Sequence, residues 1–138
     1  MNTLAVIGLG YVGLPLVVAF GKQMKTIGFD IAVSKVESCQ RGIDPSRELP
    51  DSELHAAVHA EYTADPARLA EADVIIVAIT TSPKPEDTQD YLSRLAADHS
   101  NTSILVTGMA LAQVSLKKTK NLFLFRDAAN LRQVLKTI

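Results

Sequence analysis

The sequence has little that could form a disulfide, span a membrane or attract a polyanion. Its single cysteine, Cys39, excludes an internal disulfide and fits a reducing compartment. No apolar run reaches the roughly 18 residues of a membrane-spanning helix, and no signal peptide pattern is present. The formal net charge of −1 gives no sign of binding to nucleic acid or to an anionic membrane. We therefore expect a cytoplasmic protein without nucleic-acid or membrane partners.

The signatures of several enzyme classes are missing as well. No G-x-S-x-G segment presents a serine for acyl transfer. His55 and His59 have the i, i+4 spacing of two metal ligands on one helix, but no H-E-x-x-H glutamate or obvious third ligand accompanies them. Cys39 falls within an expected helix, where a packed residue is the ordinary reading. The sequence therefore predicts no metal site and no catalytic residue.

Length and pattern predict one domain, residues 1–138, with 47% hydrophobic and 21% charged residues. Strand and helix patterns alternate, which is typical of βαβ units and a parallel sheet. Strands are expected at 4–7, 26–29, 61–63, 74–79, 104–107 and 122–125, and helices at 12–20, 32–40, 51–59, 67–72, 86–97, 111–119 and after Asp127. The expected fold class is α/β, a single Rossmann-type doubly wound parallel sheet of six strands in the order 3-2-1-4-5-6, with helices on both faces.

The most specific feature is a strand–turn–helix–strand unit at residues 4–30. Its turn has the G-x-G-x-x-G pattern, directly after the first strand and at the start of a helix. Gly8 permits the tight turn, Gly10 lets the backbone approach a pyrophosphate, and Gly13 lets the helix pack closely on the strand. The helix N-terminus adds unpaired N–H groups and the positive end of its dipole. This unit predicts a dinucleotide-binding site.

Asp30 indicates which dinucleotide is bound. It ends the second strand about 20 residues after the glycines, where an acid accepts hydrogen bonds from the ribose hydroxyls of the adenosine. A carboxylate at this place would repel the 2′-phosphate of NADP. The predicted cofactor is therefore NAD.

The first 79 residues also resemble the UDP-glucose/GDP-mannose dehydrogenase family, and most closely its branch acting on UDP-N-acetylhexosamines. The similar segments are V-I-G-L-G-Y-V-G-L-P-L at 6–16, A-F-G-K at 19–22, G-F-D at 28–30, R-G-I-D at 41–44, E-L at 53–54, E-Y-T-A-D at 61–65 and A-D-V-I-I-V at 72–77. These dehydrogenases oxidise the C6 hydroxyl of a nucleotide sugar to a carboxylate in two NAD-dependent steps. The resemblance implies the same cofactor, NAD.

The resemblance also implies particular cofactor contacts. Gly8, Gly10, Tyr11, Val12 and Gly13 match the phosphate loop, Asp30 matches the ribose-binding acid, and Lys35 lies where the family often has a basic residue near the adenosine. After the fourth strand the family has V-P-T-P, and the nearest counterpart of its threonine is Thr81 in I-T-T-S-P. After the fifth strand the family has E-S-T-V, for which V-T-G-M here offers Thr107.

The family's catalytic machinery lies in a later domain, which holds a nucleophilic cysteine with catalytic lysine, asparagine and aspartate residues. None of that domain is found in this sequence. We therefore expect the chain alone to bind NAD(H) but not to catalyse, and to meet a nucleotide sugar only together with the missing domain. The surface that would face that domain could instead pair two copies of the chain in a homodimer.

Two other functions remain open. The chain could be a stand-alone NAD(H)- or nucleotide-sensing regulatory module of a potassium channel or transporter, because those modules are single Rossmann domains of similar length. The Gly-Leu-Gly-Tyr-Val-Gly-Leu-Pro signature argues against this reading. It could also be a degenerate or engineered scaffold that has kept its fold without ligand affinity. Membrane association would favour the first alternative, and absent cofactor binding the second.

Overall fold

The computed structural model describes residues 2–79, 85–107, 121–125 and 128–137. In chain order its elements are β1 (Thr3–Ile7), α1 (Gly13–Gly21), β2 (Lys25–Phe29), α2 (Val33–Gln40), α3 (Asp51–Ala56), β3 (Ala60–Thr63), the 3₁₀ helix η1 (Pro66–Glu71), β4 (Val74–Val77), α4 (Pro85–Asp98), β5 (Ser103–Thr107), β6 (Leu122–Phe125) and α6 (Ala128–Thr137). The helix expected at 111–119 lies outside the described residues.

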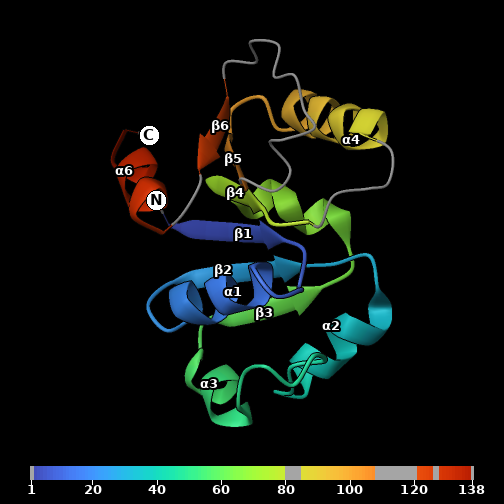
Figure 1. Ribbon diagram of the computed structural model, residues 1–138, viewed down its shortest axis with the longest axis vertical. Helices are drawn as coiled ribbons and strands as arrows, with labels where there is room; N and C mark the ends of the chain where they lie inside the picture. The colour runs from blue at the N-terminus through green and yellow to red at the C-terminus, as the bar shows by residue number, and fades with distance from the viewer. Residues whose placement is uncertain (1, 80–84, 108–120, 126–127, 138) are drawn as a thin grey trace.

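The six strands form one parallel sheet in the order β3-β2-β1-β4-β5-β6, which confirms the predicted fold class (Figure 1). Ile7 in β1 is paired with Phe29 in β2 and with Val77 in β4. These three central strands therefore end at the same level. The residues that follow them, Gly8 and Asp30 among them, meet at the carboxyl ends of these strands, where ligands of such folds bind.

Helices bury both faces of the sheet. Along β1, Leu4 and Val6 face one core and Ala5 and Ile7 face the other. The first core also receives side chains from α1, α2, α3 and α6, and the second from η1 and α4. Strands buried on both faces are apolar at every position rather than at alternate ones. This explains why the continuous apolar runs of the sequence are strands.

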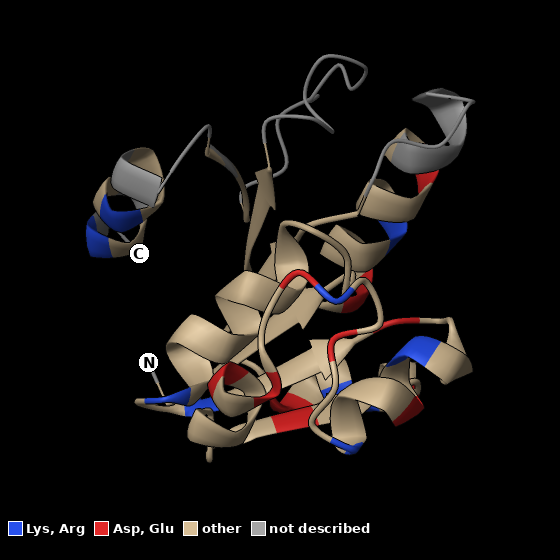
Figure 2. Cartoon of the chain, turned by 60° about the horizontal axis from the view of Figure 1, so that its bottom comes forward, with Lys and Arg blue, Asp and Glu red and all other residues tan. Residues whose placement is uncertain are grey.

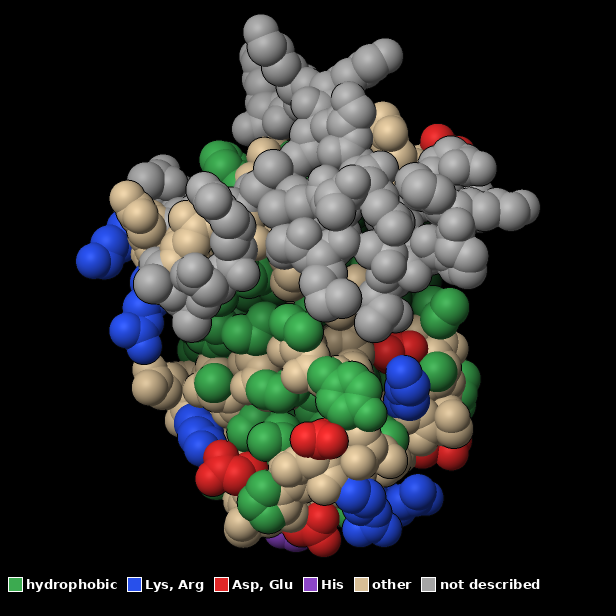
Figure 3. All heavy atoms as spheres, viewed as in Figure 1, with side chains coloured by type: hydrophobic (Ala, Val, Ile, Leu, Met, Phe, Trp, Pro, Cys, Tyr) green, Lys and Arg blue, Asp and Glu red, His purple; other side chains and the backbone are tan. Residues whose placement is uncertain are grey.

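The helix α1 is apolar on its outer side too. Its sequence, GLPLVVAFG, contains no charged or hydrogen-bonding side chain. Ala19 is exposed and Leu16 and Phe20 are only partly buried. Figure 3 shows hydrophobic side chains across the middle of this face, where α1 lies in Figure 1. Among the residues that the structure describes, Figure 2 shows basic and acidic positions interspersed along helices, strands and loops.

Most described helices differ from the sequence-based expectation by one residue at an end, and α3 and η1 differ more, in extent and in type. The helix expected from residue 12 begins at Gly13, and α3 ends at Ala56 and not at 59. At the end of α3 the chain turns, and the N–H of His59 donates to the carbonyl of Gly21 instead of continuing a helix. The helix expected at 67–72 is a 3₁₀ helix, closed by an i→i+3 bond from Ala72 to Leu69.

The loop between α2 and α3 is organised around one buried carboxylate. Asp44 is 3% exposed. Its Oδ1 accepts from the N–H and hydroxyl of Ser46, each at 2.8 Å, and its Oδ2 accepts from the N–H groups of Glu48 and Leu49 at 3.1 and 2.9 Å. Burial raises the pKa of this carboxyl group, but the hydrogen bonds outweigh burial and hold the pKa below its usual value.

We expect Asp44→Asn to lower the free energy of unfolding by about 1–3 kcal/mol at neutral pH, because an amide nitrogen would face backbone donors. The folded-state pKa of Asp44 lies below the unfolded-state value. Its contribution is therefore present above the unfolded pKa and is lost as the pH falls through the folded pKa. Urea unfolding should show the gap between wild type and variant closing in acid, with the exposed Asp98→Asn as control. A gap that is independent of pH would contradict this assignment.

Candidate functional site

Two glycines of the turn after β1 are required by backbone geometry. Gly8 has φ +102°, and a Cβ there would lie 2.8 Å from the carbonyl oxygen of Ala78. A Cβ on Gly13 would lie 1.6 Å from the carbonyl oxygen of Gly8. Only glycine adopts the positive φ of residue 8 without strain, and only glycine leaves room for the carbonyl oxygen of Gly8 at residue 13. The turn therefore brings the start of α1 directly against the end of β1.

Gly10 differs from these two glycines, because it faces open space. A Cβ on Gly10 would meet no described atom within 4 Å. The N–H groups of Gly10, Tyr11 and Val12 have no partner within the described ranges, and the side chains of Tyr11 and Val12 are exposed. Free N–H groups that directly precede a helix form a site for an anion such as a phosphate.

Asp30 joins the turn to the next strand. Its Oδ2 accepts from the N–H of Leu9 at 3.0 Å, and its Oδ1 accepts from the N–H of Ala32 at 2.9 Å. Its own N–H donates to the carbonyl of Thr63. Because each carboxylate oxygen has two lone pairs, both oxygens can accept a further hydrogen bond. The carboxylate is thus fixed in place and still able to bind ligand hydroxyl groups.

An apolar pocket of about 210 Å³ adjoins this carboxylate. It is lined by Ile7, Gly8, Phe29, Asp30, Ile31, Ile79 and Tyr91. Burial raises the pKa of the Tyr91 phenol, which therefore stays neutral. Sequence reasoning missed Ile31, Ile79 and Tyr91 as site residues. The exposed fraction of Ile31, 83% beside an acid, suggests a ligand surface, but it is known only from the structure and could not have been used as a sequence signal.

Two further residues that were predicted to bind the cofactor do not line this pocket. Lys35 is exposed on α2, and Thr107 is buried at the end of β5, and neither lines the pocket. Thr81 lies outside the described residues. The structure therefore brings together the glycine turn and Asp30, whereas the cofactor contacts of Lys35 and Thr107 stay predictions.

Within the part of the chain that the structure describes, the cysteine and histidine side chains form no nucleophilic or metal-binding site. Cys39 is 2% exposed in α2, and burial, followed by the charges of Asp44 and Asp30, raises its pKa to about 12. His59 lies beyond the end of α3, so it does not share a helix face with His55. Within the described residues no group of three or more His, Cys, Asp or Glu side chains could hold a metal ion. No helix in the same ranges is long and apolar enough to cross a membrane.

The chain matches proteins of known family. Residues 2–113 match the NAD binding domain of the UDP-glucose/GDP-mannose dehydrogenase family. Protein CapL of Staphylococcus aureus is 38% identical over 96 residues, which are 70% of this chain and 22% of that protein. UDP-N-acetyl-D-glucosamine 6-dehydrogenase of Pseudomonas aeruginosa is 36% identical over 104 residues, which are 75% of this chain and 25% of that protein.

A solved structure shows the same fold. The UDP-N-acetyl-mannosamine dehydrogenase Cap5O from Staphylococcus aureus superposes with a TM-score of 0.59 at 20% identity, covering 91% of this chain and 36% of that one. The chain spans about a quarter or less of the curated relatives named above. It belongs to the UDP-glucose/GDP-mannose dehydrogenase family, and residues 2–113 are matched by that family's NAD-binding domain.

Proposed function

We propose that this domain binds NAD at the carboxyl ends of the strands β1, β2 and β4. One observation carries the proposal: the Asp30 carboxylate is bound to the N–H of Leu9, which directly precedes the free N–H groups of residues 10–12, and it also lines an apolar pocket. These are the three surfaces that the adenosine diphosphate half of NAD needs, for its ribose, its pyrophosphate and its adenine. The residues present therefore fit this cofactor.

Each part of the cofactor has a proposed partner. The pyrophosphate would accept from the N–H groups of residues 10–12 and lie at the positive end of the α1 dipole. The ribose hydroxyls would donate to Asp30, which would also repel the extra phosphate of NADP. The adenine would lie in the apolar pocket, against Ile31, Ile79 and Tyr91. Lys35, Thr81 and Thr107 stay predictions from the family resemblance.

For the complete protein we propose oxidation of the C6 hydroxyl of a UDP-N-acetylhexosamine, with NAD as the hydride acceptor. The names of the relatives, a UDP-N-acetyl-D-glucosamine 6-dehydrogenase and a UDP-N-acetyl-D-mannosamine dehydrogenase, support this substrate class. Residues 1–138 would bind NAD(H) without catalysing, since the family's nucleophilic cysteine motif is not among them. A cytoplasmic location and a homodimer stay predictions from the sequence.

Calorimetric titration of NADH, NADPH and ADP-ribose into the purified chain tests the binding proposal. We expect NADH to bind in the micromolar to sub-millimolar range, with a free energy of about −5 to −8 kcal/mol, and to bind more tightly than NADPH. ADP-ribose should bind about as well as NADH, because the proposed contacts are all on the adenosine diphosphate half. No heat with any of the three, from a chain shown to be folded by circular dichroism, would refute the proposal.

A further inference from the structure

One side chain anchors the glycine turn to the core. Of residues 8–12, two are glycines, and the side chains of Tyr11 and Val12 are exposed. Leu9 is 2% exposed and belongs to the first core, to which α1 also contributes. Its N–H donates to Oδ2 of Asp30 at 3.0 Å. Leu9 therefore couples the position of the turn to the orientation of the acid that we assign to the ribose.

A glycine of the neighbouring strand makes room for the Leu9 side chain. A Cβ on Gly28, in β2, would lie 2.9 Å from Cδ2 of Leu9 and 2.9 Å from Cδ1 of Tyr62. Carbon atoms that are not bonded to each other pack about 3.5–4.0 Å apart. The missing side chain of Gly28 is thus what lets Leu9 and Tyr62 lie where they do. Gly28 precedes Asp30 by two residues, so this contact is close to the hydrogen bond between Leu9 and Asp30.

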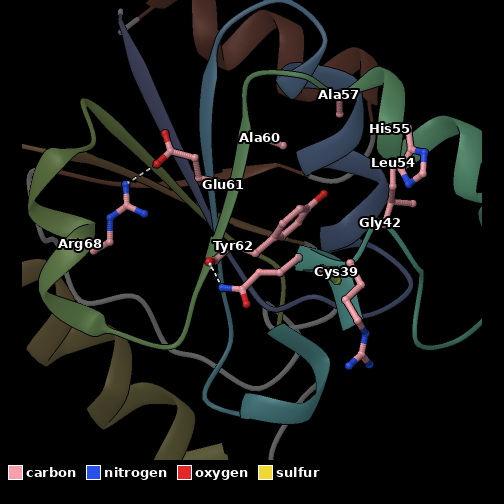
Figure 4. A pocket seen from close by; sticks show the side chains of 11 residues that line it. Cys39, Gly42, Leu54, His55, Ala57, Ala60, Glu61, Tyr62 and Arg68 are labelled. Carbon is pink, nitrogen blue, oxygen red and sulfur yellow. Dashed lines mark hydrogen bonds and ion pairs between the residues drawn. The ribbon is translucent and has the colours of Figure 1, made fainter. Parts of the chain in front are cut away.

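Of the two neighbours of Gly28, Tyr62 is the more firmly held. Its backbone is paired with Gly28 in the register of β2 and β3, and its carbonyl accepts from Nε2 of Gln40 at 3.0 Å. Its side chain projects from β3 to the side opposite Glu61, and its hydroxyl oxygen is buried (Figure 4). Leu9 belongs to a turn and not to a strand. An atom added at Gly28 therefore displaces mainly Leu9.

We propose that Gly28 is a positioning residue for cofactor binding. It makes room for Leu9, and the N–H of Leu9 holds Oδ2 of Asp30 in the orientation in which the carboxylate accepts from the ribose hydroxyls. A side chain at residue 28 moves Leu9 away from β2 and breaks this hydrogen bond, so Asp30 keeps its charge but loses its alignment. The inference rests on the proposed NAD site, and it adds a residue outside the G-x-G-x-x-G pattern.

Amide hydrogen exchange tests the positioning step without any cofactor. In Gly28→Ala we expect the Leu9 amide to exchange about tenfold faster or more, relative to the amides of β4, because its acceptor is displaced. Gly21→Ala is the matched control, since a Cβ there would lie 2.8 Å from Cβ of Ala60, near the amino end of β3. This control should leave the relative exchange rate of Leu9 unchanged. Equal rates for Leu9 in the two variants would overturn the proposal.

Titration of NADH and of its 2′-deoxyadenosine analogue measures the effect of the alignment on binding. The wild type and Gly21→Ala should bind NADH about tenfold more tightly than the analogue, which lacks a hydroxyl that donates to Asp30. In Gly28→Ala this ratio should fall to about twofold or less. A ratio that stays at the wild-type value would overturn the proposal. If the wild type binds neither nucleotide, the NAD site itself is refuted, a result on which the exchange experiment does not depend.

A double variant distinguishes positioning through Leu9 from a general loss of packing. Leu9→Ala shortens the side chain but keeps the N–H that holds Asp30. In Gly28→Ala/Leu9→Ala the new Cβ no longer meets Cδ2, so the ratio of the two affinities should recover toward the wild-type value. The melting temperature should stay below that of the wild type, because buried methyl groups are lost. A ratio that remains low in the double variant would show that Gly28 does not act through Leu9.

Discussion

Replacing Gly10 by alanine is expected to weaken NADH binding by about tenfold or more while leaving the melting temperature unchanged. A methyl group at this position meets no described atom within 4 Å, and the backbone there is not in the left-handed region. The added Cβ therefore costs the folded chain little. It does occupy the space beside the free N–H groups of the turn, which is where we place the pyrophosphate.

Gly13→Ala is the informative counterpart, because the same methyl group is added three residues later. Here the Cβ would lie 1.6 Å from the carbonyl oxygen of Gly8, so α1 must move away from β1. This variant should lose NADH binding. It should also melt at a lower temperature, with a free energy of unfolding that is lower by about 1–3 kcal/mol.

Thermal denaturation followed by circular dichroism, together with calorimetric titration of NADH, separates the two variants. Gly10→Ala should affect binding alone and Gly13→Ala should affect both quantities. If Gly10→Ala binds NADH as the wild type does, the pyrophosphate does not lie at this turn. If Gly13→Ala is as stable as the wild type, the close approach of α1 to β1 is not required.

The sheet could be predicted from the sequence because its signals are local. Residues 4–7 and 74–77 are continuous apolar runs, and the turn glycines fix where the first strand gives way to a helix. In the structure these runs are β1 and β4, paired at the centre of the sheet. The exact helix ends were less predictable. The end of α3 depends on a bond from His59 to Gly21, which no local pattern of residues 51–59 reveals.

The residues of the candidate site, too, could be predicted where their signal is local and not where it depends on packing. Gly8, Gly10, Gly13 and Asp30 belong to one short βαβ unit, and the structure brings them together at one sheet edge. Tyr91 was missed, because it lines the pocket from α4 and its position depends on how α4 packs against the second core. Lys35 and Thr107 came only from matching positions to a family, and in this chain neither lines the pocket.

Asp30→Asn should weaken NADH binding by about tenfold and remove the preference for NADH over NADPH. The two carboxylate oxygens accept from Leu9 and Ala32 on opposite sides. An asparagine has one acceptor oxygen, so one of these N–H groups would face an amide nitrogen. The variant therefore loses the charge that repels a 2′-phosphate, and it also loosens the attachment of the turn to β2.

The ratio of the two affinities is the decisive measurement, because it separates local from general effects. Any loss of one negative charge strengthens the attraction for both nucleotides, and NADPH carries more charge than NADH. Asp51→Asn, an exposed acid at the start of α3, controls for this long-range term. If Asp51→Asn leaves the ratio unchanged and Asp30→Asn brings it near one, Asp30 selects the cofactor by direct contact. If both variants change the ratio equally, the selection comes from net charge, and the ribose does not lie at Asp30.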